Sequence, residues 1–266
     1  MSNVSLQIGG AVNYEIPNSV YERIDEDGTP NPEGDYLYFG SYPQSKTEKG
    51  YKVERLKWRI LDDNYGDGTA LIVCNVIVDQ IAYQSNYEYI GGDYYATDGS
   101  NIIVDDDATI GEGVDSNHYV YANNYKHSEL REYLTGTFYN TAFNENEKSS
   151  IVLTEVDNSL ASTNNNGGEC VCENTNDYVF ALSLADVKNT EYGYKNGTED
   201  PYKSIELTDY AIANGARIYS GNTGFALLRS PINNSFRSCL VYGGGSYSDL
   251  VNRDGCGVVP ALQIRL

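Results

Sequence analysis

The chain has 266 residues, which is enough to bury a substantial core in one large domain or two small ones. Its 38 Asp and Glu residues outnumber its 18 Lys and Arg residues, so the formal net charge is −20 at pH 7. A field of this sign repels nucleic-acid phosphates and anionic lipid headgroups, which argues against a nucleic-acid partner.

Targeting and redox signals are weak. The longest apolar run, around residues 70–78, has the length of a strand, so we expect no membrane insertion. The first residues lack the basic start and the long apolar centre of a secretory signal. This leaves a phage particle, the cytoplasm or a trimmed surface protein as possible locations. Five cysteines are too few and too scattered for a disulfide framework.

Residues 1–33 differ from the rest of the chain. The stretch 25–34 is acidic, contains Pro and Gly, and shows no apolar periodicity, which is typical of a linker. The sequence therefore predicts an N-terminal extension and acidic linker over residues 1–33. A folded domain is predicted over residues 34–266.

The first elements of this domain are predicted strands. Aromatic and β-branched residues mark them at 36–44, 57–61 and 69–77, with a turn cluster at 62–68. Residues 91–117 are polar and irregular, which favours a long surface insertion.

Short helices follow in the second half. Ser128 precedes an apolar face at residues 129–134, and Asn144 with Glu147 forms the pattern of a capping box. Ser183 and Thr208 are candidate caps of two further short helices, the second ending at Gly215. Short helices between short strands, with long connections, predict the α+β class.

Catalytic and metal-binding patterns are sparse. The sequence has no phosphate-binding glycine loop and no nucleophile elbow, and it has two histidines, His118 and His127. The loop 62–68 offers carboxylate and amide oxygens suited to calcium, but Val73 stands where a calcium loop needs a bidentate Glu. We therefore predict no cofactor, with calcium as the alternative.

The last forty residues combine two kinds of sequence. Apolar ends at 227–231 and 258–264 enclose residues 233–257, in which Asn, Ser, Gly and Tyr supply 14 of 25 positions. This mixture is typical of antibody binding loops, although a glycine-rich hairpin with polar turns has the same composition.

Several short sequence motifs follow one another along the chain in a characteristic order. They are FGSYPQ at 39–44, WRIL at 58–61, SELREYL at 128–134, FYNTAF at 138–143, DYVFALS at 177–183, TDYA at 208–211, LRSP at 228–231 and GVVPAL at 257–262. In this order they resemble a bacterial domain family of unknown function. The resemblance implies a C-type-lectin-like fold of the type found in formylglycine-generating (sulfatase-modifying) enzymes.

The resemblance also carries functional expectations. Some proteins with this fold are variable proteins of diversity-generating retroelements, whose C-terminal segment is rewritten at adenines, and residues 233–257 are similar in place and composition. The enzymes of this branch bind copper through two close cysteines, whereas Cys239 and Cys256 are separated by sixteen residues. A sister branch holds iron with histidines, for which two histidines are too few.

We therefore predict a non-enzymatic recognition domain that displays residues 233–257 to a protein or glycan ligand. Tyr and Arg are the expected anchors, because they contribute disproportionately to binding energy at interfaces. A copper-dependent oxidase and a calcium-dependent glycan-binding lectin are the alternatives. The predicted binding residues are Asn233, Asn234, Phe236, Arg237, Tyr242, Tyr247, Asp249, Asn252, Arg253 and Asp254.

Overall fold

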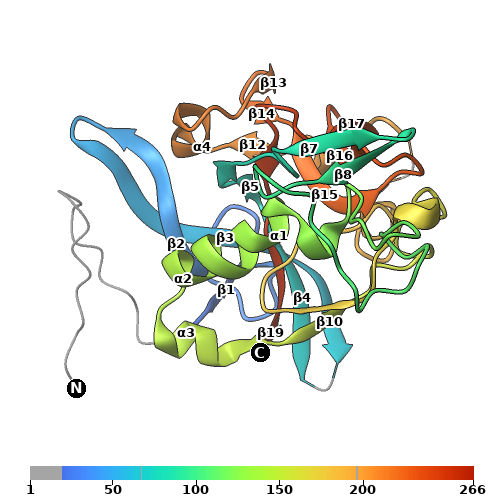
Figure 1. The fold of residues 1–266 in the computed structure, drawn as a ribbon. Coiled ribbons are helices and arrows are strands. Elements are labelled where there is room, and N and C mark those ends of the chain that lie inside the picture. Colours follow the sequence, from blue (N-terminus) through green and yellow to red (C-terminus); the bar gives the residue numbers. More distant parts are fainter. Residues whose placement is uncertain (1–19, 67, 196) are drawn as a thin grey trace.

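The computed structural model describes residues 20–66, 68–195 and 197–266, and it has the α+β class that the sequence predicts. Within these residues the strands form a six-stranded, a five-stranded and a four-stranded sheet and two strand pairs. The helices are short and lie between the strands in sequence (Figure 1). None of the helices in the described part is long and apolar enough to cross a membrane.

The six-stranded sheet contains the fully buried strand β4 (Thr69–Cys74). Its order is β1 (Glu22–Ile24), β2 (Tyr36–Thr47), β3 (Gly50–Gly66), β4 (Thr69–Cys74), β19 (Ala261–Arg265) and β9 (Ile151–Val152). All six residues of β4 are buried, as their continuous apolar run predicts. The indole of Trp58 is buried and donates to the Phe39 carbonyl at 2.7 Å, which ties β3 to β2.

The predicted linker is partly wrong. Strand β1 pairs antiparallel with β2, placing Glu22 opposite Tyr38, and the side chain of Ile24 is fully buried. The acidic stretch after β1 forms turns, in which Asn31 donates its backbone N–H to the Arg23 carbonyl at 3.0 Å. The fold therefore begins before residue 34, because one buried isoleucine anchors a polar segment. Residues 1–19 of the predicted extension lie outside the described part.

Two predicted strand boundaries also shift. Strand β3 continues through the predicted turn at 62–66, with register irregularities near Asp62, so the reversal lies between β3 and β4. The predicted strand 69–77 divides at Asn75, whose N–H donates to the Lys57 carbonyl at 2.9 Å. Beyond it, β5 (Val76–Ile77) enters the four-stranded sheet.

Helices cover part of the six-stranded sheet. Figure 1 shows α1 (Glu129–Tyr133), α2 (Tyr139–Ala142) and α3 (Glu145–Ser150) on one side of β2 and β3. A π-helical turn, η2 (Leu134–Phe138), joins α1 to α2. Ser128 caps α1, and Asn144 with Glu147 forms the predicted capping box of α3. The capping predictions at these two helices are confirmed.

The five-stranded sheet carries the C-terminal segment. Its order is β17 (Gly245–Leu250), β16 (Arg237–Tyr242), β15 (Ala226–Pro231), β18 (Gly257–Val258) and β6 (Asp79–Gln80). The chain then passes through Pro260, whose carbonyl accepts from Cys74 N–H at 2.8 Å, into β19. The apolar segment 258–264 thus contributes strands to two sheets and links them.

The remaining elements are small. The four-stranded sheet contains β13 (Ile218–Ser220), β14 (Thr223–Gly224), β12 (Glu206–Leu207) and β5, and helix α4 (Asp209–Ala213) follows β12 with the predicted Thr208 cap. The strand pairs are β7 (Tyr87–Ile90) with β8 (Asp93–Ala96), and β10 (Thr154–Val156) with β11 (Thr175–Asp177). Single 3-10 turns are η1 (Tyr125–His127), η3 (Gly168–Cys170), η4 (Asp186–Lys188) and η5 (Pro201–Lys203).

The predicted surface insertion 91–117 is more ordered than expected. It includes β8 and three members of a small buried cluster, Ala96, Ala108 and Val114, which Val120 completes just beyond the segment. Isolated bridges, such as Val104 with Tyr119, hold this segment together. The apolar residues are too widely spaced in the sequence to show a periodicity. They form a core only because the fold brings them into contact.

Candidate functional site

The hairpin of β16 and β17 lies at the edge of the five-stranded sheet. Tyr242 and Gly245 are paired across it, and Gly243 and Gly244 form a two-residue turn with φ angles of 54° and 84°. Two consecutive positive φ angles are typical of the type I′ turn, which matches the twist of the flanking strands. This turn fixes which residues of the hairpin share a face.

Four aromatic rings meet on one face of this hairpin. We call Tyr219, Phe225, Tyr242 and Tyr247 the tyrosine face. The rings of Tyr242 and Tyr247 stack at 4.2 Å between centroids, and Tyr242 also lies 4.5 Å from Phe225 and 4.9 Å from Tyr219. Tyr219 and Tyr247 retain 49% and 40% of their surface in solvent. The rings of the tyrosine face therefore pack against one another and are also open to solvent.

Charged side chains border the tyrosine face. The guanidinium of Arg217 lies 4.1 Å from the centroid of Phe225, in cation–π contact. Asp249 forms an ion pair with Arg253 at 3.5 Å, and the neighbouring Asp254 is exposed. Burial, together with the neighbouring hydroxyls of Tyr247 and Tyr219, raises the pKa of Tyr242.

The predicted binding residues are spread along the hairpin. Tyr242 and Tyr247 belong to the tyrosine face, near the glycine turn. Asp249 lies opposite Ser238, toward the other end of the hairpin, and pairs with Arg253. Arg237 begins β16 at that end, about 17 Å from Tyr242 along the strand, and Phe236 precedes it. That one ligand contacts all of these residues stays a prediction.

Phe236 takes part in a second aromatic group. Its ring lies 4.6 Å from that of Tyr94, which in turn contacts Tyr89 at 4.8 Å, and Arg237 lies over Phe236 at 5.7 Å. Tyr89 is 61% exposed. This group joins the start of β16 to the β7–β8 hairpin.

The three predicted asparagines differ in their surroundings. Asn233 is exposed, and Asn252 lines a polar hollow with Ser85 and Asn86. Asn234 is half-buried, and its carbonyl accepts from the Asn123 side chain at 2.6 Å. Asn234 therefore supports the turn before β16 more than it faces solvent.

Sequence reasoning missed Arg217, Tyr219 and Phe225. Arg217 precedes β13, Tyr219 lies in β13, and Phe225 precedes β15, all outside the segment with the unusual composition. The excess of tyrosine over phenylalanine, 25 to six, was the available signal, but it does not say which tyrosines meet.

Cys239 and Cys256 do not form a pair. Both are buried and free, on β16 and just before β18, with β15 between these strands. Two steps across a sheet separate them by about 10 Å, whereas bridged cysteines need Cα atoms within about 7 Å. Burial raises the pKa of both thiols to about 12, so neither is a thiolate at neutral pH.

The candidate calcium loop is occupied by internal contacts. Asp62 accepts from the Asn64 N–H at 2.9 Å, and Asp63 pairs with Arg23 at 3.3 Å. Asp67 lies outside the described residues. In the described part of the chain no three His, Cys, Asp or Glu side chains are grouped to hold a metal. His127 instead lies 2.7 Å from Asp105, which also binds Lys126.

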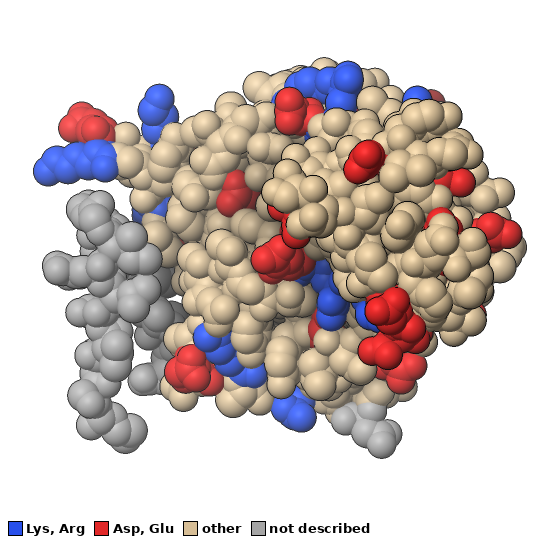
Figure 2. Space-filling view, viewed as in Figure 1, with Lys and Arg blue, Asp and Glu red and all other residues tan. Residues whose placement is uncertain are grey.

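Charge on the visible face is dispersed. Figure 2 shows acidic side chains at several separate places with basic ones between them, so the net charge of −20 is not gathered into one patch there. A dispersed pattern gives solubility without a directed field for one cation.

Residues 98–266 match the model of a family described as a domain of unknown function, DUF6273. The match covers more than half of the chain. The chain belongs to this family. No curated protein and no solved structure matches the chain.

The family match includes the whole tyrosine face and its border. It does not include β1 to β8, which end at Ala96. Strand β19 pairs with β4, and β18 pairs with β6, so strands before residue 98 complete both large sheets. The matched region of this family member is therefore not a separate folding unit in this structure.

Motifs of the resemblance lie largely in the core. Trp58, Leu228 and Leu262 are buried, and so is Arg229, the arginine of LRSP. Arg229 pairs with Asp186 at 2.8 Å and donates to the Ala181 carbonyl at 2.9 Å. These motif residues therefore contribute to the core of this chain.

Proposed function

We propose that this member of the family is a non-enzymatic recognition domain and that the tyrosine face is its binding surface. The observation that supports this most is the stacked, half-exposed Tyr242–Tyr247 pair on a two-residue hairpin, with Arg217 and Arg253 at its border. Aromatic and arginine side chains held by a rigid frame lose little entropy on binding, so they make efficient anchors. We further propose a C-type-lectin-like fold of the formylglycine-generating-enzyme type, which the order of the core motifs supports.

The proposed ligand is a protein or glycan surface. Exposed tyrosine rings offer apolar area and hydroxyl groups together, which suits both classes. The negative charge of the chain disfavours nucleic acid.

The diversified-segment hypothesis remains a proposal about the gene. Its structural support is that Asn233, Tyr247 and Asp254 are exposed, while buried neighbours such as Leu240 hold the sheet. A reverse-transcriptase gene nearby, with a near-copy of the 3′ coding segment that differs at adenines, is the expected genomic context. Mismatches spread equally over all four bases would refute it.

The tyrosine face is tested by comparing two double variants. Tyr242→Ser with Tyr247→Ser removes the stacked pair, and Tyr139→Ser with Tyr178→Ser removes another stacked pair, at 5.2 Å, away from the hairpin. A glycan array and a displayed peptide library supply ligands selected on the parent chain. We expect the first variant to weaken binding at least tenfold, about 1.4 kcal/mol, and the second to bind like the parent. Equal losses in both variants, or none in the first, would contradict the proposal.

A further inference from the structure

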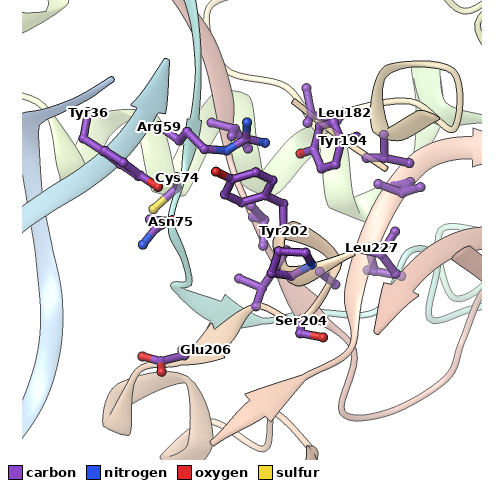
Figure 3. A pocket seen from close by; sticks show the side chains of 18 of the residues that line it. Tyr36, Arg59, Cys74, Asn75, Leu182, Tyr194, Tyr202, Ser204, Glu206 and Leu227 are labelled. Atoms are coloured by element: carbon purple, nitrogen blue, oxygen red, sulfur yellow. The ribbon is translucent and has the colours of Figure 1, made fainter. Parts of the chain in front are cut away.

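A cavity of about 230 Å³ lies between the two large sheets, away from the tyrosine face. Its walls come from β2, β3 and β4 on one side and from β15, β16 and the loop around η5 on the other. Figure 3 shows Arg59, Tyr36, Tyr194 and Tyr202 grouped on one part of the wall. The volume corresponds to roughly seven water molecules at about 30 Å³ each, which is room for a small organic molecule.

Arg59 is the unusual group in this cavity. It is 6% exposed, and its guanidinium lies between the rings of Tyr202 and Tyr194, at 3.8 and 4.7 Å from their centroids. Its Nη1 donates to the Tyr192 carbonyl at 2.6 Å. Its buried Nη2 has no hydrogen-bond partner among the described residues.

Other buried cations in this fold are neutralised. Arg229 pairs with Asp186 at 2.8 Å, and Lys203 pairs with Asp200 at 3.3 Å. Arg59 forms no ion pair with any residue in the described ranges 20–66, 68–195 and 197–266. A buried cation without a counter-charge is costly, and a buried donor without an acceptor adds to the cost. An anionic ligand would remove both costs.

The rest of the cavity defines which anion fits. Leu182, Val187 and Leu227 supply an apolar wall. Figure 3 shows the hydroxyls of Tyr36 and Tyr202 directed toward one another beside Arg59, so a second donor is within the same region. The exposed carboxylates of Glu26 and Glu206 also line the cavity, which disfavours multiply charged anions such as phosphate.

We propose that this cavity binds a small monocarboxylate with an apolar body. The carboxylate would accept from Nη2 of Arg59 and from a tyrosine hydroxyl, while the apolar body contacts the leucine and valine wall. Arginine suits this role because its planar fork matches a carboxylate and because its charge persists at every physiological pH. The proposal does not depend on the tyrosine face.

The test measures the melting temperature and the heat of binding of the full chain with sodium acetate, butyrate, hexanoate, benzoate and phosphate. Sodium chloride at matched ionic strength is the reference. We expect a saturable rise in melting temperature with the monocarboxylates that have apolar bodies, because ligands of the native state stabilise it. Acetate is expected to bind more weakly than butyrate, hexanoate or benzoate, since it leaves the apolar wall uncovered.

Three variants locate the site. Arg59→Lys retains the charge but loses the planar fork of the guanidinium, and we expect its dissociation constant to be at least tenfold higher than that of the parent. Tyr202→Phe retains the ring but loses the hydroxyl, and we expect its dissociation constant to be about threefold higher. Tyr178→Phe, at a tyrosine that does not line the cavity, is expected to bind like the parent. If Arg59→Lys does not fold, Tyr202→Phe still tests the site.

Two results would overturn the proposal. One is that the carboxylates raise the melting temperature no more than sodium chloride does. The other is tighter binding of phosphate than of the monocarboxylates, which would indicate a general anion site.

Discussion

At the scale of single residues, the buried Arg229 connects distant segments of the chain. Its guanidinium has five N–H donors and donates to an aspartate, a serine and two backbone carbonyls, those of Ala181 and Asp157. It therefore joins β15 to two segments that are distant in sequence, 157–162 and 181–186. An apolar residue of similar length would leave Asp186 and the carbonyls without their partner.

Arg229→Leu is expected to lower the free energy of unfolding by about 3–5 kcal/mol, because breaking a buried pair leaves an uncompensated charge. Arg229→Lys should lose less, since it keeps the charge and loses the fork. The exposed Arg265→Leu serves as control and should change stability by about 0.5 kcal/mol or less. Urea unfolding measures all three, and equal effects at positions 229 and 265 would contradict the assigned role.

Asp105 gives a prediction about pH. Partial burial raises its pKa, but the pairs with Lys126 and His127 outweigh burial and lower the pKa to about 2. A carboxyl with a depressed native pKa stabilises the fold above its unfolded pKa of about 3.9, and this contribution is lost as the pH falls toward 2.

We therefore expect the parent to lose about 1–2 kcal/mol more than Asp105→Asn between pH 5 and pH 2, allowing for solvent screening. Urea unfolding at several pH values measures this difference. Asp107→Asn, at an exposed neighbour, should follow the parent curve. A parent and Asp105→Asn that respond to acid in parallel would refute the pairing.

At the scale of elements, hairpin turns are the clearest link between sequence and structure. Gly244 has a φ of 84°, and a Cβ there would lie 2.4 Å from the Thr198 carbonyl oxygen. Gly68, between β3 and β4, has a φ of 72° with nothing near a Cβ. Substitutions at the two glycines therefore distinguish the cost of backbone strain from the cost of a steric overlap.

Gly68→Ala is expected to cost about 1–2 kcal/mol from the left-handed backbone alone. Gly244→Ala should cost more, because the loop at residue 198 must also move. Chemical denaturation compares the two variants. A smaller loss for Gly244→Ala than for Gly68→Ala would show that this loop does not rest on the turn.

At the scale of the whole molecule, the C-terminal segment contains both exposed positions and positions buried in the core. Asn233, Tyr247, Arg253 and Asp254 are exposed, whereas Leu240 is buried at the centre of β16. Strand β16 contributes to both proposed sites, because Val241 lines the cavity and Tyr242 belongs to the tyrosine face. The fold thus separates the two proposed sites by one sheet.

Replacing Asn233, Tyr247, Arg253 and Asp254 together by Ser is expected to change the free energy of unfolding by no more than about 2 kcal/mol, because surface substitutions have small effects. Leu240→Ala alone should cost about 2–5 kcal/mol through a core cavity. Thermal and urea unfolding measure both. A fourfold variant less stable than Leu240→Ala would show that the segment does not tolerate variation.

Local features were predictable because their causes are local. The apolar run of β4, the caps at Ser128, Asn144 and Thr208, and the glycine turn of the β16–β17 hairpin each depend on neighbouring residues and their hydrogen bonds. The α+β class followed from the alternation of such elements. By contrast, the pairing of β1 depended on one buried isoleucine in a polar segment.

The sequence by itself determined the apolar run of β4, the helix caps, the acidic charge and the unusual composition of residues 233–257. Only the tertiary structure decided that the predicted binding residues spread along the β16–β17 hairpin, that Tyr219 and Phe225 complete the tyrosine face, and that Arg59 faces a cavity without a counter-charge among the described residues. The physical reason is that periodicity and capping act within a few residues, whereas stacking, ion pairing and desolvation depend on which distant strands the folded chain brings into contact.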